Sequence, residues 1–93
     1  MIRIEFTEPY HSSLRKTLEK NSTLHKNINT AVKRFVRNSI DTRLHTHALK
    51  KRMKGKWAFS VTDDIRIVFI WMGKSTARFL AIGSHRDVYG KGI

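Results

Sequence analysis

The sequence predicts an α+β domain, formed by one strand, two helices and a three-stranded antiparallel meander. Three observations support this prediction. Residues 2–6 alternate apolar and charged side chains, residues 7–37 contain two helical apolar stripes, and residues 57–82 contain three apolar segments separated by short polar turns. We expect the two helices to cover one face of the sheet and to leave the other face available.

The first helix is expected to begin directly after the N-terminal strand. Thr7 is a candidate cap, Glu8 places an acid in the first turn, and Pro9 fits the start of a helix. The apolar stripe of this helix is formed by Tyr10, Leu14 and Leu18. A second helix is predicted over residues 24–37, with a wider apolar face formed by Leu24, Ile28, Ala31, Val32, Phe35 and Val36.

The last third of the chain is predicted to form the meander. Residues 57–61 alternate apolar and small or polar side chains, residues 65–71 are apolar except for Arg66, and residues 76–82 form the last strand. The turn at residues 62–64 contains two aspartates, and glycine begins the turn at residues 73–75. The last strand is expected to end in a tail, residues 83–89, that carries His85.

Size and charge limit the classes of function. The 93 residues are expected to form one domain, residues 1–93, and their net charge of +12 attracts polyanions, so RNA, DNA or an acidic protein is the expected partner. Since 40% of the residues are hydrophobic, the chain can form a core. It has no cysteine, which excludes disulfides and thiolate metal sites, and no apolar run of membrane-spanning length. We therefore expect a cytoplasmic protein that does not enter a membrane.

Two charged residues near the acidic turn are candidates for chemistry. Arg66 begins an apolar strand, so its guanidinium must reach solvent, a bound anion or a carboxylate, and Asp63 and Asp64 are the carboxylates across the turn. Asp64 itself could serve only the turn, or it could accept a proton from a sugar hydroxyl or orient a histidine.

Histidines supply the candidate proton carriers. His85 lies at the end of the last strand and is followed by Arg86 and Tyr89, whose phenol could stack on a base. His45 and His47 could imitate a three-histidine zinc site together with His85, but no carboxylate supports that arrangement, so we expect no metal. Proton transfer or phosphate contact is the preferred role for His47.

A run of cations forms the clearest electrostatic feature. Five cations occur within seven residues without an acid, and these are Lys50, Lys51, Arg52, Lys54 and Lys56. The run could be a solvated loop. Near a nucleic acid it would bind the phosphate backbone and provide affinity and positioning, with little sequence information.

Taken together, these segments resemble the toxins of the bacterial RelE/ParE superfamily, and most closely its YafQ-like branch. The resemblance covers nearly the whole chain and is most specific in residues 47–50, residues 57–69, and residues 82–85 with Val88 and Tyr89. It implies a small, basic toxin of a type II toxin–antitoxin system, with an antitoxin protein as partner and no small-molecule cofactor. Many members are ribosome-dependent endoribonucleases (mRNA interferases) that cut translated mRNA, whereas the ParE branch inhibits DNA gyrase.

The resemblance also implies site residues. The YafQ-like motif carried onto this chain places functional side chains at His47, Asp64, His85 and Tyr89, and the RelE-like arginine corresponds to Arg66. YafQ-like members have a further histidine where this chain has Ser60. Either Arg66 compensates for that imidazole, or activity is reduced.

Cleavage of RNA without a metal needs a base for the ribose 2′-hydroxyl, an acid for the leaving 5′-oxygen, and cations for the charge that develops. We expect His85 to act as the acid, Asp64 or His47 to act on the 2′-hydroxyl, and Arg66 with Lys54 to stabilise the transition state. The alternatives are a ParE-like gyrase inhibitor, a plain RNA- or DNA-binding module, and a toxin homologue weakened by the change at Ser60.

Overall fold

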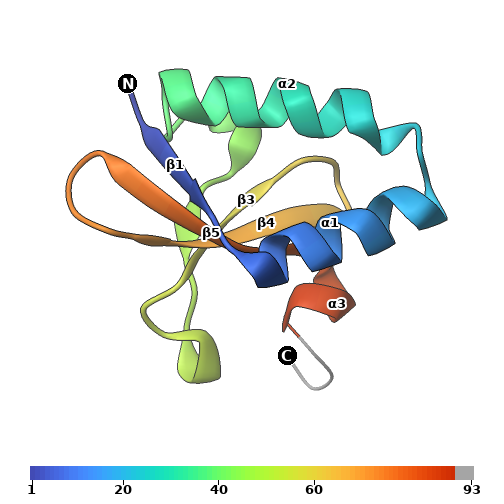
Figure 1. The fold of residues 1–93 in the computed structure, drawn as a ribbon. Coiled ribbons are helices and arrows are strands. Elements are labelled where there is room, and N and C mark those ends of the chain that lie inside the picture. The colour runs from blue at the N-terminus through green and yellow to red at the C-terminus, as the bar shows by residue number, and fades with distance from the viewer. Residues whose placement is uncertain (90–93) are drawn as a thin grey trace.

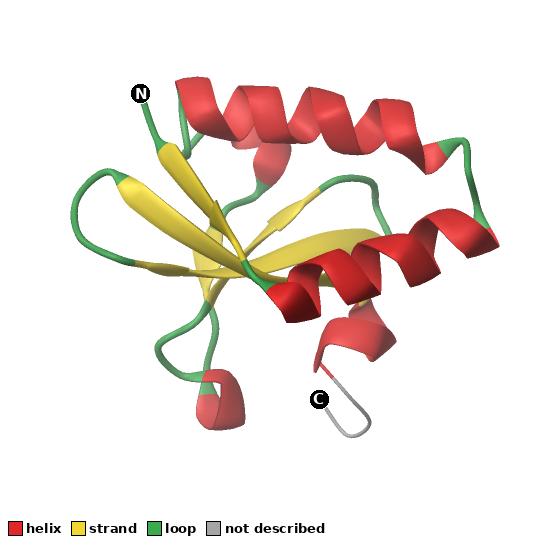
Figure 2. Ribbon diagram, in the orientation of Figure 1, coloured by secondary structure: helices red, strands yellow, loops and turns green. Residues whose placement is uncertain are grey.

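The computed structural model describes residues 1–89 as an α+β fold (Figures 1 and 2). The helices are α1 (Glu8–Lys20), α2 (Leu24–Arg37) and α3 (His85–Tyr89), with short 3-10 turns η1 (Thr42–Leu44) and η2 (Lys51–Met53). The strands are β1 (Arg3–Phe6), β2 (His47–Ala48), β3 (Trp57–Ser60), β4 (Ile65–Trp71) and β5 (Thr76–Ser84). None of the helices within residues 1–89 has the length and apolar character needed to cross a membrane.

The five strands form one mixed sheet in the order β1-β5-β4-β3-β2. Strands β3, β4 and β5 form the predicted antiparallel meander, and β1 adds to it by pairing in parallel with β5. The predicted α+β class, with an N-terminal strand, two helices and a meander, is confirmed. The sequence analysis did not predict the two-residue strand β2 or the helix α3.

The cap expected at the start of α1 is present. The Tyr10 backbone N–H donates to Thr7 Oγ1 at 3.2 Å, and the same hydroxyl donates to the Phe79 carbonyl on β5 at 2.8 Å. A cap of this kind satisfies one of the free N–H groups at a helix start. Because the hydroxyl also bonds to β5, it fixes the beginning of α1 against the sheet.

The main core lies between one sheet face and the two long helices, which Figure 1 shows on the same side of the sheet. Its centre consists of fully buried aromatic rings, namely Phe35, Phe59, Phe69 and Phe79. Phe35 of α2 stacks on Phe59 of β3 with ring centroids 4.5 Å apart. Burial of one such side chain contributes about 1.5–3 kcal/mol, so this cluster is the main stabilising element of the fold.

A smaller cluster lies on the opposite sheet face. Ala58, Val68 and Tyr89 are buried there, and Leu80 packs against them. Val68 pairs with Ala81 and Phe69 with Phe79, so Leu80 is an extra residue on β5 that turns its side chain to this face. The face that we expected to remain available is therefore covered in part by α3, whose Tyr89 provides the apolar contact.

Candidate active site

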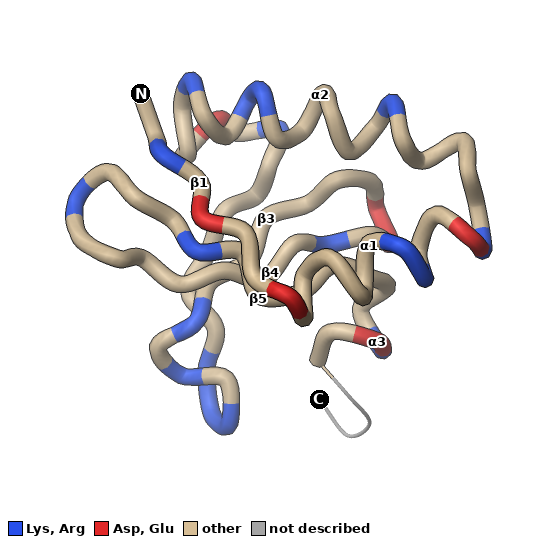
Figure 3. Tube along the Cα trace, in the orientation of Figure 1, with Lys and Arg blue, Asp and Glu red and all other residues tan. Residues whose placement is uncertain are grey.

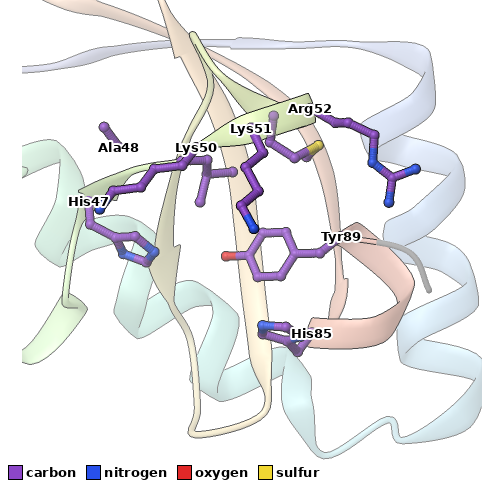
Figure 4. Close-up of a pocket in the computed structure, with 9 residues that line it drawn as sticks. His47, Ala48, Lys50, Lys51, Arg52, His85 and Tyr89 are labelled. Carbon is purple, nitrogen blue, oxygen red and sulfur yellow. The ribbon is translucent and has the colours of Figure 1, made fainter. Parts of the chain in front are cut away.

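A pocket of about 410 Å³ opens between the segment that follows β2 and the helix α3 (Figure 4). Its polar lining consists of His47, Lys50, Lys51, Arg52, His85 and Tyr89. Leu49 and Met53 add apolar walls. Residues separated by about forty positions in the sequence thus meet because the segment after β2 and the helix α3 pack on the same face of the sheet.

The imidazole of His47 is held in one orientation. Its Nδ1 lies 2.7 Å from the His45 carbonyl oxygen. Since a carbonyl oxygen can only accept a hydrogen bond, Nδ1 carries the proton and Nε2 of the neutral ring is left as an acceptor. His45 itself has a left-handed backbone with φ 51°, which turns the chain just before β2. His47 is therefore set up to take a proton.

His85 and Tyr89 form the other wall of the pocket. They lie one helical turn apart on α3, and their rings meet edge to face with centroids 4.4 Å apart. Tyr89 is only 7% exposed, and its hydroxyl has no hydrogen-bond partner within residues 1–89. Burial raises the pKa of the Tyr89 phenol, against a smaller opposing effect of the Arg66 guanidinium. The phenol is thus a neutral hydrogen-bond donor at physiological pH.

The segment expected to be a tail is instead the helix α3. The Asp87 N–H donates to Ser84 Oγ at 3.2 Å, and the Ser84 N–H donates to Asp87 Oδ2 at 3.4 Å. This reciprocal pair is a capping box, whose sequence signal is a serine followed three residues later by an acid. Ser84 and Asp87 have this spacing in the sequence, so a helix start could have been predicted where a tail was expected.

Arg66 is bound to a hydroxyl. Its Nη1 donates to Ser60 Oγ at 2.8 Å and contacts the Thr62 carbonyl at 3.5 Å. The ion pair with Asp63 or Asp64 that the turn suggested is not formed among residues 1–89. Arg66 and Ser60 line a second pocket of about 340 Å³, and His47 lines both pockets. The guanidinium therefore lies in a pocket that adjoins the pocket of His47, His85 and Tyr89 (the main pocket) and shares His47 with it.

Asp64 lies away from these residues. It lines a separate pocket of about 430 Å³ with Thr17, Lys20 and Asp87, next to α1. Its backbone N–H donates to Thr62 Oγ1 at 3.3 Å, which is turn chemistry. The structure thus brings His47, His85 and Tyr89 together, places Arg66 next to them, and leaves Asp64 apart.

Figure 3 shows Lys and Arg residues along the loop that contains η2. Lys50, Lys51 and Arg52 line the main pocket, whereas Lys54, Lys56 and Arg86 do not. Lys51 has φ 58°, a left-handed conformation that is uncommon for lysine and that clusters at functional sites. In Figure 4 its side chain points toward the ring of Tyr89. Among residues 1–89, no three His, Asp or Glu side chains are grouped so that they could hold a metal ion.

No protein-family model matches the chain, and no curated protein matches its sequence. Solved structures match it closely in fold. YafQ from E. coli strain BL21(DE3) is 16% identical, with a TM-score of 0.79 over 97% of this chain and 100% of that chain. The chain therefore has a YafQ-like fold.

Two further structures show how widely this fold is shared. A YoeB/ParE toxin from Agrobacterium tumefaciens is 16% identical, with a TM-score of 0.73 over 90% of this chain and 99% of that chain. A chain of the E. coli DinJ-YafQ toxin–antitoxin complex is 19% identical, with a TM-score of 0.76 over 96% of this chain and 98% of that chain. The predicted resemblance to the YafQ-like branch is therefore confirmed at the level of the fold.

Within this YafQ-like fold, Ser60 has a role that the sequence analysis did not find. In sequence, Ser60 stands out only as the position of a missing histidine, but its hydroxyl is the acceptor that orients Arg66. The signal was available, because Ser60 and Arg66 are placed symmetrically about the predicted turn and therefore face each other across β3 and β4. No pattern in the sequence predicted that Leu49 and Met53 would line the pocket.

Proposed function

We propose that this protein is the toxin of a type II toxin–antitoxin pair and that it cleaves mRNA on the ribosome without a metal ion. One observation carries the proposal. His47, with Nε2 free to accept a proton, and His85, with its edge against the buried phenol of Tyr89, face one pocket lined by cations. Two imidazoles across a pocket are suited to paired proton transfer on a phosphodiester.

The reaction follows from this arrangement. His47 Nε2 takes the proton of a ribose 2′-hydroxyl, and the 2′-oxygen forms a bond to the adjacent phosphorus. The bond from phosphorus to the 5′-oxygen breaks, and protonated His85 gives its proton to that oxygen. The products are a 2′,3′-cyclic phosphate and a 5′-hydroxyl. His47 is favoured over Asp64 as the base because Asp64 lines a different pocket.

Cations and the phenol support the transition state. The charge that develops on the phosphoryl oxygens is stabilised by Lys51, in the pocket, and by Arg66, beside it. Lys54, which the sequence analysis paired with Arg66, does not line the pocket, so Lys51 takes that role. Tyr89 donates a hydrogen bond from its neutral hydroxyl and offers its ring to a base.

An antitoxin completes the proposal. YafQ, a structural neighbour, forms a toxin–antitoxin complex with DinJ. A net charge of +12 and an open pocket lined by lysines favour a partner with an acidic segment that folds onto this surface. We propose such an antitoxin as the protein partner, and the ribosome with its mRNA as the target, in the cytoplasm.

The test is cleavage of translated mRNA, with the 5′ ends mapped after induction. We expect His47→Ala and His85→Ala each to lower cleavage by roughly a hundred- to ten-thousandfold, the usual contribution of acid–base catalysis. Asp63→Ala removes an exposed carboxylate from the turn that also contains Asp64, and it serves as the control. Asp64→Ala distinguishes the two candidate bases, because it matches the loss in His47→Ala only if Asp64 acts on the 2′-hydroxyl.

Undiminished cleavage in both histidine variants contradicts the proposed chemistry. A DNA supercoiling assay run beside the cleavage assay identifies a gyrase inhibitor. Salt-dependent RNA binding without any cleaved product identifies a binding module.

A further inference from the structure

The position of α3 requires an explanation, because this helix carries both His85 and Tyr89. It contains five residues, His85–Tyr89, far fewer than an isolated helix needs to be stable in water. Packing of Tyr89 against Ala58 and Val68 holds its C-terminal end. The N-terminal end, where exposed His85 lies, must be held by other contacts.

Those contacts meet at Asp87. Its carboxylate accepts the Ser84 N–H at 3.4 Å, and its own N–H donates to Ser84 Oγ at 3.2 Å. Its Oδ2 also lies 3.8 Å from Nζ of Lys20, the last residue of α1. One side chain thus caps α3 and connects it to a neighbouring helix.

The helix at the other end of this connection is itself fixed to the sheet. Ser13 Oγ accepts the Ile82 N–H at 3.0 Å, and Thr17 Oγ1 donates to the Ile82 carbonyl at 3.3 Å. At the next residue of β5, Gly83 allows a close approach, since a Cβ there would lie 2.9 Å from Asp87 Cβ. Only glycine fits at that position without a shift of α3.

Asp87 does not face the pocket of His47 and His85. It lines two other cavities, and Lys20 and Thr17 line both of them with it. Its carboxylate therefore has no contact with the groups proposed to act on RNA.

We propose that Asp87 is a positioning residue and that Lys20, Gly83, Ser84 and Asp87 form a clasp that fixes His85 and Tyr89 at the pocket. The inference rests on the proposed function for its effect on cleavage. Within the clasp, the two hydrogen bonds between Asp87 and Ser84 contribute most to holding α3. The ion pair with Lys20 is exposed, and such pairs contribute little. The same ranking holds for the pKa of the Asp87 carboxyl, which lies below its usual range chiefly through the hydrogen bond with Ser84.

The test compares three variants of the full chain. Asp87→Ala removes the cap, and Asp87→Asn keeps an oxygen that can accept from Ser84. Glu8→Ala is the matched control, because Glu8 is an exposed carboxylate in an ion pair of the same 3.8 Å length, at the far end of α1. Each variant is measured by mRNA cleavage and by the NMR cross-peak between the rings of His85 and Tyr89, whose centroids are 4.4 Å apart.

We expect Asp87→Ala to weaken the cross-peak and to lower cleavage by roughly two- to thirtyfold, the range set by loss of a capping residue. Asp87→Asn should restore most of both signals, and Glu8→Ala should leave both unchanged. An Asp87→Ala variant with the wild-type cross-peak and wild-type cleavage overturns the inference. So does global unfolding of that variant, since the clasp is proposed to hold only α3 in place.

The two proposals fail in different ways. If the wild-type protein cleaves no RNA, the proposed function fails, while the cross-peak still reports on the clasp. If the wild type cleaves and Asp87→Ala keeps both the wild-type cleavage and the wild-type cross-peak, the clasp fails and the proposed function stands.

Discussion

Replacing Ser60 with alanine tests whether a hydroxyl holds Arg66 beside the pocket. The two residues are paired directly across β3 and β4, and Nη1 of Arg66 lies 2.8 Å from Ser60 Oγ. A hydrogen bond to a charged group contributes about 1.5–3 kcal/mol. Because Arg66 is only partly buried and keeps a longer contact with the Thr62 carbonyl at 3.5 Å, the lower value applies. We therefore expect a loss of about 1.5 kcal/mol, which corresponds to roughly tenfold.

Two assays measure this loss. Urea unfolding of Ser60→Ala should show a lower free energy of unfolding by about 1–1.5 kcal/mol, and mapped mRNA cleavage should fall about tenfold, because the guanidinium is no longer oriented toward the developing charge. Ser75→Ala is the control, since Ser75 is an exposed serine whose hydroxyl makes no hydrogen bond among residues 1–89. If Ser60→Ala unfolds and cleaves like the wild type, the hydroxyl does not position Arg66.

Three further substitutions test the core, the helix α1 and the approach of α3. Phe35→Ala removes a fully buried ring that stacks on Phe59, so the free energy of unfolding in urea should fall by about 3–5 kcal/mol; a loss below about 1 kcal/mol contradicts the packing. Burial raises the pKa of Tyr10 to about 12, so the stability that its neutral phenol provides is complete below the unfolded pKa of 10.0 and is lost as the pH rises through about 12. Unfolding measured from pH 8 to 12.5 should therefore show a loss of up to about 3 kcal/mol that Tyr10→Phe does not show, and equal pH profiles refute the assignment. Gly83→Ala places a Cβ 2.9 Å from Asp87 Cβ, so α3 should shift and cleavage should fall, while an unchanged His85 to Tyr89 cross-peak argues against the close contact.

The elements that the sequence predicted are those with a long apolar period. Helices α1 and α2 and strands β3, β4 and β5 each repeat an apolar position often enough to be recognised. Strand β2 has two exposed residues and exists only because it pairs with β3, which is a tertiary contact. Helix α3 is too short to show a period, and its one local signal is the capping box.

The site follows the same division between local and tertiary information. Residue types and order identified His47, His85 and Tyr89 as partners, and the structure places them in one pocket. The resemblance also placed Asp64 among the site residues, but the structure puts it in a separate pocket next to α1. The strand after the turn was predicted correctly, since β4 spans Ile65–Trp71. The sequence did not provide the direction in which the turn between β3 and β4 points its side chains, because that direction depends on tertiary packing.

The distribution of charge argues that the pocket is completed by a polyanion. The chain has seven acidic residues, and within residues 1–89 four of them form ion pairs, which are Glu5–Arg78, Glu8–Arg15, Asp41–Arg43 and Asp87–Lys20. None of these pairs involves a residue that lines the main pocket. The strongest of them, between Asp41 and Arg43, holds the pKa of the Asp41 carboxyl far below its usual range and lies on the side of α2. Since these pairs use no lysine of the pocket, Lys50 and Lys51 attract the phosphates of a nucleic acid or an acidic protein segment. Under the proposed function these two ligands compete for the same positive electrostatic field, and this competition is how an antitoxin would inhibit cleavage.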